Sequence, residues 1–178
     1  MHPRLEEIEA YLGEVRGQLT AIVATSPPGT LTRRPSENAW SGAEIVHHLG
    51  QVEGATTKML ESLFARALAD GLPAETHTTS LLNCLDQYHV LDRGRRRIEA
   101  PERLRPPRDA DLERAFDALG KVRERTLSAV ATVDGRDLSA VAAPHPVLGV
   151  LNGYQWVLFL GQHEARHLNQ IKENLTRT

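Results

Sequence analysis

Residues 151–171 read LNGYQWVLFLGQHEARHLNQI, and the spacing of their apolar side chains predicts a helix with one buried face. At ~100° per residue, His163 and His167 lie one helical turn apart in the middle of that face. The apolar residues that share their arc are Trp156, Phe159, Leu160 and Ile171. The opposite side carries Arg166, Asn169 and Lys172. The helix therefore turns two imidazoles toward the core of the protein.

Two imidazoles within an apolar face need polar partners. An unpaired buried polar group costs roughly 1–3 kcal/mol by mutational estimates. A backbone carbonyl or a carboxylate could satisfy each ring separately, and for a lone core histidine this is the more common arrangement. A shared metal ion would satisfy both rings at once, because neutral imidazole is a common ligand of zinc, nickel and iron.

A second helix begins in WSGAEIVHHL, residues 40–49. Ser41 is placed as its N-cap, Glu44 follows three residues later to close a capping box, and Trp40 is placed to pack on Ile45 as a hydrophobic staple. The buried face continues along the helix to about Asp70, before Gly71 and Pro73 end it, through Ile45, Leu49, Val52, Met59 and Leu63.

The phase of this second helix separates two adjacent histidines. At ~100° per residue, His48 lies about 60° from Ile45, whereas His47 lies about 160° away. His48 can therefore point into a bundle, and His47 is expected to face solvent. Together with His163 and His167, His48 would complete a three-nitrogen metal site with coordination positions open for water or substrate.

The remaining segments predict an all-α protein. A helical period covers roughly Pro3 to Thr25, and another begins after Asp109 or Asp111 and ends before Val133-Asp134-Gly135. This third helix is expected to turn inward Leu112, Phe116, Leu119, Val122, Thr126 and Val130. No long stretch shows the alternation of a half-buried strand. A four-helix bundle is therefore the favoured architecture.

Two connections frame the predicted fourth helix and the middle of the chain. Asn152 and Gln155 are spaced as a second capping box at the start of that helix. Residues 71–108 carry weak signals: SLLNCLDQYHVL, residues 80–91, could form a short helix, and the prolines at 101, 106 and 107 indicate an extended connector. We expect this connection to cross the bundle and to join two helices that need not be neighbours.

Length and charge restrict the classes of function. The 178 residues suit a single domain, 1–178, and the 21 Lys+Arg against 23 Asp+Glu give a net charge of −2. This balance offers no field for nucleic acid or an anionic membrane, and the arginines at 93 and 95–97 are expected to be a solvated face. Cys84 is the single cysteine, so no internal disulfide forms. Without an apolar run of roughly 18 residues or a secretion signal, a cytoplasmic protein is expected.

The residues 163–167, HEARH, also fit the H-E-x-x-H pattern of zinc peptidases. Three fixed positions are a weak filter in a charged helix, and no strand is evident to bind an extended peptide, so peptidase activity is disfavoured. Glu164 would flank a metal, join its outer shell or form a surface ion pair. Gln51, Glu53 and Arg166 are further outer-shell candidates, although an ordinary surface position is preferred for each. No general acid or base is assigned.

The other five histidines lack the geometry of a metal site and are expected at the surface or in loops: His2, His47, His77, His89 and His145. Of these, His145 is the most interesting, because it directly precedes the helix that carries the histidine pair.

Three motifs resemble the DinB-like superfamily of metal-binding four-helix bundles, over nearly the whole chain. The first is the tryptophan-serine helix start leading to histidine-leucine, Trp40-Ser41 to His48-Leu49. The second is the His-Pro-x-x-Gly turn from His145 to Gly149, and the third is the terminal His-x-x-x-His-x-x-Gln-Ile, 163–171. The superfamily also includes bacillithiol transferases and mycothiol-dependent maleylpyruvate isomerases.

The resemblance implies an up-down-down-up bundle with a long crossover between the second and third helices. It also implies a divalent metal held by His48, His163 and His167, with zinc expected first and nickel, iron or manganese as alternatives. The favoured activity is transfer of a low-molecular-weight thiol, as co-substrate, to a small electrophile. Hydrolysis of a small molecule and a non-catalytic metal- or ligand-binding bundle are the alternatives. A homodimer is a common habit of such relatives.

Overall fold

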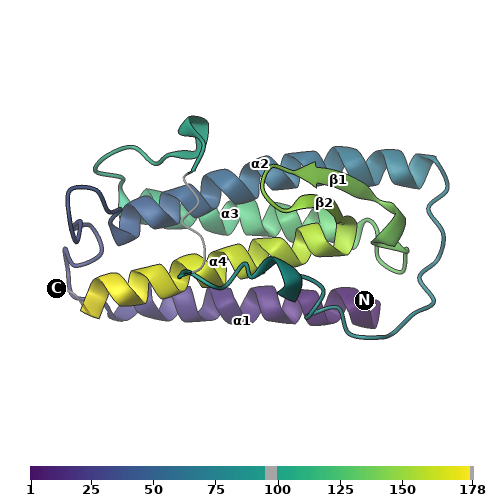
Figure 1. Cartoon of the computed structure of the whole chain (residues 1–178), viewed down its shortest axis with the longest axis horizontal. Coiled ribbons are helices and arrows are strands. Elements are labelled where there is room, and N and C mark those ends of the chain that lie inside the picture. The colour runs from purple at the N-terminus through teal and green to yellow at the C-terminus, as the bar shows by residue number, and fades with distance from the viewer. Residues whose placement is uncertain (95–99, 177–178) are drawn as a thin grey trace.

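Four long helices form the molecule in a computed structural model that describes residues 1–94 and 100–176. They are α1 (Pro3–Thr25), α2 (Gly42–Ala69), α3 (Leu112–Ala131) and α4 (Gly153–Thr176). α1 and α4 run in one direction along the long axis, and α2 and α3 run in the other (Figure 1). The expectation of an all-α, up-down-down-up four-helix bundle is thus confirmed.

Side-chain caps fix where the helices begin. Before α2, the Ser41 hydroxyl accepts a hydrogen bond from the Glu44 N–H at 3.2 Å, and the Glu44 carboxylate accepts one from the Ser41 N–H at 2.7 Å. Asn152 and Gln155 make the same reciprocal pair at the start of α4, with both distances 2.9 Å. Each box satisfies two N–H groups that the first helical turn leaves without a partner. Both capping boxes predicted from the sequence are therefore formed.

The crossover between α2 and α3 returns along the length of the bundle (Figure 1). Its described part contains only two short 3₁₀ helices, η1 (Asp86–Tyr88) and η2 (Glu102–Leu104). In the segment 80–91, which could have formed a short helix, Asp86–Tyr88 are helical. The arginines at 93 and 95–97 were predicted to be a solvated face. Of these, Arg93 donates to both carboxylate oxygens of Glu173 on α4, at 3.0 and 3.1 Å. The arginines at 95–97 lie outside the described residues.

A short β-hairpin, which the sequence did not indicate, precedes α4. Strand β1 (Ala142–His145) pairs antiparallel with β2 (Gly149–Asn152). Strands of four residues are too short for alternation to stand out, and Pro144 and Pro146 argued for a connection instead. Gly149 has a φ of +84°, which glycine adopts without steric strain. The hairpin is an addition to an all-α bundle.

The interior of the bundle has three layers along its axis. One apolar cluster occupies the end that contains Leu5, Phe64 and Val130, and a second occupies the end that contains Leu19, Ile45 and Ile171. Between them lie the buried charged side chains Glu53, Arg123 and Glu164, joined by the largely buried Arg16. Of the α3 residues predicted to face inward, Leu119, Thr126 and Val130 are buried, while Leu112, Phe116 and Val122 are half-buried.

The beginning of the crossover is fastened to the bundle by Glu75. Its carboxylate accepts hydrogen bonds from Arg4 of α1 at 2.9 Å and from the hydroxyl of Tyr154 of α4 at 2.6 Å. The N–H of His77 donates to it at 2.7 Å. Burial raises the pKa of the Glu75 carboxyl, but these three donors outweigh it and lower that pKa to about 2.

Substituting glycines in two helices tests the close packing of α1 on α4. A Cβ at Gly161 would lie 2.9 Å from the ring of Tyr11, whereas one at Gly17 would meet nothing within 4 Å. We expect Gly161→Ala to lower the free energy of unfolding by about 1–3 kcal/mol through overpacking. Gly17→Ala should raise it by about 0.4–1 kcal/mol, because alanine favours the helix. Urea unfolding measures both, and equal stabilities for the two variants would contradict the close approach.

Tyr154→Phe tests the anchor at Glu75 through its pH dependence. Loss of a hydrogen bond to a charged group should lower the free energy of unfolding by about 1.5–3 kcal/mol at pH 7. Because the folded-state pKa of Glu75 is depressed, the stabilisation is complete above its usual value of 4.5 and is lost as the pH falls toward about 2. Denaturant unfolding should therefore give a wild-type advantage that shrinks across this window. A constant advantage down to pH 2.5 would refute the assignment.

Candidate metal centre

The structure brings His48 of α2 together with His163 and His167 of α4. The ring centroids lie 5.4 Å apart for His48 and His163, 5.0 Å for His48 and His167, and 4.6 Å for His163 and His167. One nitrogen from each ring lies within 4.8 Å of the other two. Since Zn–N bonds are about 2.0–2.1 Å long, one cation can reach all three nitrogens after small side-chain rotations.

Hydrogen bonds fix the tautomers of two of these rings. Nδ1 of His48 lies 2.7 Å from the carbonyl oxygen of Leu104, and Nδ1 of His167 lies 2.9 Å from Oε1 of Gln170. Both partners only accept, so each Nδ1 carries the proton and donates. Nε2 of each ring therefore keeps its lone pair for a metal. This is the arrangement that outer-shell groups usually impose on histidine ligands.

The three imidazoles are neutral near pH 7. Burial lowers the pKa of all three rings, and the positions of the rings beside one another lower the pKa values of His163 and His167 further. The pKa of His167 falls to about 3, and that of His163 lies well below its usual range. A metal must compete with protons for these nitrogens, so neutral rings favour its binding.

Aromatic rings extend from the cluster on both sides. Trp40 lies 4.9 Å from His48, and Phe159 lies 5.4 Å from His163, between ring centroids. His145, in the hairpin, continues this series at 4.6 Å from Phe159. Its Nδ1 accepts hydrogen bonds from the N–H groups of Val147 and Leu148, both at 3.1 Å, so the neutral ring carries its proton on Nε2. His145 is thus the half-buried last residue of β1, close to the three histidines.

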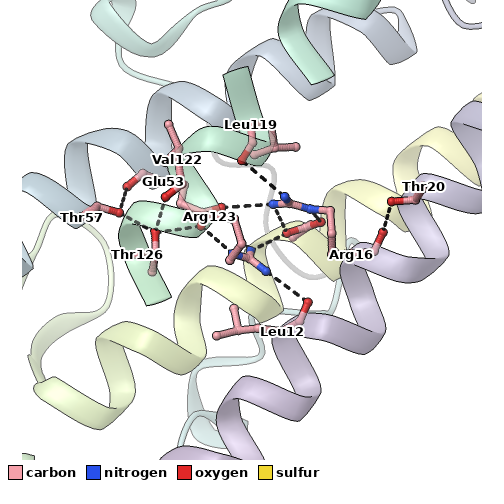
Figure 2. A network of polar contacts seen from close by, with 10 residues as sticks. Leu12, Arg16, Thr20, Glu53, Thr57, Leu119, Val122, Arg123 and Thr126 are labelled. Atoms are coloured by element: carbon pink, nitrogen blue, oxygen red, sulfur yellow. Dashed lines mark hydrogen bonds and ion pairs between the residues drawn. The ribbon is translucent and has the colours of Figure 1, made fainter. Parts of the chain in front are cut away.

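The prediction of surface positions for Glu53 and Glu164 is wrong. Both residues are buried, at 4% and 1% exposure, and their carboxylates bind Arg16 and Arg123 inside the bundle. Figure 2 labels Glu53 and the two arginines. A single charged residue beside an apolar stripe is typical of a surface position, and the arginines that pair with these glutamates lie on other helices. Because both oxygens of Glu164 are held by guanidinium groups, Glu164 is not placed as the general base of a zinc peptidase.

The outer face of α2 near the cluster is less exposed than expected. His47, expected in solvent, is half-buried, and its Nδ1 has no hydrogen-bond partner within the described ranges. Oε1 of Gln51 is likewise buried without a partner there. The crossover covers His48 itself, since η2 contacts α2 and the carbonyl oxygen of Leu104 accepts the bond from His48. Arg166 is half-buried as well and donates to the carbonyl of Val90 at 3.0 Å.

The chain belongs to the DinB superfamily, whose sequence profile matches residues 11–171. Among curated proteins, it is 33% identical over 147 residues to the uncharacterized protein YuaE of Bacillus subtilis (strain 168), which covers 80% of this chain and 82% of that protein. Among solved structures, it is similar to TT2238, described as a four-helix bundle protein, with a TM-score of 0.64 and 23% identity. That likeness covers 94% of this chain and 98% of TT2238, and it shows the fold alone.

Superfamily membership and the histidine cluster both point to a protein that could hold a metal. The DinB superfamily is typically metal-binding and includes metal-dependent enzymes, and the cluster offers a set of nitrogens that could hold a metal. The curated relative carries no described activity from which a substrate could be taken. None of the described helices is both long enough and apolar enough to cross a membrane.

Proposed function

We propose that His48, His163 and His167 bind one divalent cation and that the protein is a metal-dependent enzyme acting on a small molecule. The observation that supports this most directly is the set of three ligand nitrogens within 4.8 Å of one another, contributed by two helices. Zinc is the expected cation, and nickel, iron or manganese suit the same imidazole set less specifically. The net charge of −2 favours a small-molecule substrate over nucleic acid.

The reaction that we favour is transfer of a low-molecular-weight thiol to a small electrophile. A cation held by the three histidines would supply Lewis-acid chemistry, which lowers the pKa of a thiol or of water. The thiol sulfur then forms a bond to the electrophilic carbon, the leaving group departs with the electron pair, and the thiol proton passes to solvent. The protein's own part is to hold three neutral imidazoles in place.

Hydrolysis is the second candidate, and the buried charges weigh against it. Activation of a water molecule usually calls for a general base within hydrogen-bond reach. The carboxylates nearest to the histidines in sequence are Glu44, Glu53 and Glu164. Arg34 holds Glu44, and Arg16 and Arg123 hold the other two. Thiol transfer has less need of such a base, because the pKa of a free thiol, about 8.5, is already far below that of water, about 15.7, and a cation would remove the thiol proton outright.

Metal analysis of purified protein tests the binding site. We expect the wild type to hold about one divalent cation per chain, and His48→Ala and His163→Ala each to lose it, because two imidazoles bind far more weakly than three. His77→Ala, which alters an exposed histidine of the crossover, is the matched control and should retain the metal. Elemental analysis after dialysis gives the stoichiometry. A wild type without metal, or variants that keep it, would exclude this site.

An activity panel then separates the candidate reactions. Metal-loaded wild type should accelerate the reaction of cysteine, glutathione or bacillithiol with a chromogenic electrophile, and the metal-free protein and His163→Ala should not. Ester and amide substrates are assayed in parallel. Turnover of these alone would indicate a hydrolase, and no metal-dependent turnover in either panel would mean a non-catalytic bundle.

Gln170 offers a test of the hydrogen bond to His167. Gln170→Ala removes the acceptor for Nδ1, and outer-shell losses of this kind typically weaken metal binding about 10- to 100-fold. Asn169→Ala, at the exposed neighbouring position, should leave the zinc affinity unchanged. Competition with a chromogenic chelator measures both dissociation constants. Equal affinities would show that the tautomer of His167 does not depend on Gln170.

A further inference from the structure

Each of the four helices contributes one charged side chain to the layer between the two apolar clusters. Arg16 comes from α1, Glu53 from α2, Arg123 from α3 and Glu164 from α4, and we call these four residues the charged quartet. Figure 2 labels the first three. Its two positive and two negative groups balance. The quartet therefore links helices that are otherwise joined mainly by apolar packing.

Arg123 bridges the two glutamates directly. Its Nε donates to Oε1 of Glu53 at 2.6 Å, and its Nη2 donates to Oε2 of Glu53 at 3.1 Å and to Oε2 of Glu164 at 2.7 Å. Arg16 spans the same pair, with Nε 2.7 Å from Oε1 of Glu164 and Nη2 3.4 Å from Oε2 of Glu53. Two guanidinium groups thus hold the carboxylates of α2 and α4 together.

Further partners complete the hydrogen bonding of the quartet. The Thr126 hydroxyl lies 2.9 Å from Oε1 of Glu53, and the remaining guanidinium nitrogens donate to the carbonyl oxygens of Leu12 at 3.1 Å and Leu119 at 3.3 Å. Groups engaged in this way are poorly placed to bind a substrate. The chemistry of the quartet is therefore that of a fixed internal brace.

The carboxylates of the quartet lie close to the histidines in the sequence. Glu164 directly follows His163 on α4, and Glu53 lies five residues after His48 on α2. A shift of α4 by one residue would move its side chains by about 1.5 Å along the axis. Apolar burial has no preferred direction, whereas short charge-assisted hydrogen bonds of fixed geometry would break on such a shift. The register that the quartet sets is thus also the register in which His48 meets His163.

We infer that the charged quartet positions the metal ligands: Arg16, Glu53, Arg123 and Glu164 fix the register of α2 against α4 so that His48, His163 and His167 converge on one cation. This inference rests on the proposed function. The four residues act through the histidines and touch neither substrate nor metal. If the quartet only stabilised the fold, replacing it with apolar residues would leave zinc binding unchanged, because buried ion pairs can often be replaced by well-packed apolar residues with little loss of stability.

The test is a charge-free variant, Arg16→Met, Glu53→Leu, Arg123→Met and Glu164→Leu combined. The matched control is Arg125→Met with Glu61→Leu, which removes an exposed pair that links α3 to α2. Zinc affinity is measured by chelator competition, the visible spectrum of bound Co²⁺ reports the ligand geometry, and circular dichroism reports folding. We expect the charge-free variant to stay helical, to bind zinc at least tenfold more weakly and to show an altered Co²⁺ spectrum. The control should match the wild type.

Wild-type affinity and spectrum in the folded charge-free variant would overturn the inference. Should that variant fail to fold, Arg123→Lys decides the matter, because lysine keeps the charge but cannot bridge two carboxylates with a planar fork. A folded Arg123→Lys protein with weakened zinc binding supports positioning, and one with wild-type binding overturns it. A wild type that binds no zinc at all refutes the proposed function itself, which separates the two failures.

Discussion

The neutral cluster of two arginines and two glutamates at the middle of the bundle constrains the rest of the structure. Three of its four charges are buried and the Arg16 guanidinium is largely so, and removing any one would leave a buried partner uncompensated, which is strongly destabilising. The apolar clusters on either side supply most of the hydrophobic burial, but their contacts are not directional. The hydrogen bonds between the charged groups are directional, so they form in only a few relative positions of the four helices.

The histidine cluster occupies the side of this charged layer where α2 and α4 face the crossover. Burial keeps the rings neutral, and Gln170 and the Leu104 carbonyl orient two of them. Three features therefore order the site: the register of the helices, the hydrogen bonds that fix the tautomers of two rings, and the crossover that covers the site.

Local signals predicted the helices well. The capping residues Ser41 and Asn152 marked two helix starts, and the apolar period gave α1 its bounds, because these signals act within a few residues. Helical phase also selected His48 over His47 as the ring that meets the C-terminal pair, although metal binding by these rings stays a prediction. The hairpin and the burial of Glu53 and Glu164 were missed. The strands of the hairpin are too short for an alternating pattern to show, and the burial of the two glutamates depends on arginines of other helices, which no local pattern records.

The bond from His48 to Leu104 has an evolutionary consequence. The acceptor is a main-chain oxygen, so the orientation of this ring depends on the path of the crossover and not on the identity of residue 104. Homologues can therefore differ at residue 104 while retaining the same histidine geometry. Conservation in an alignment would understate the importance of the segment, whereas a deletion that shortened it would release the imidazole at once.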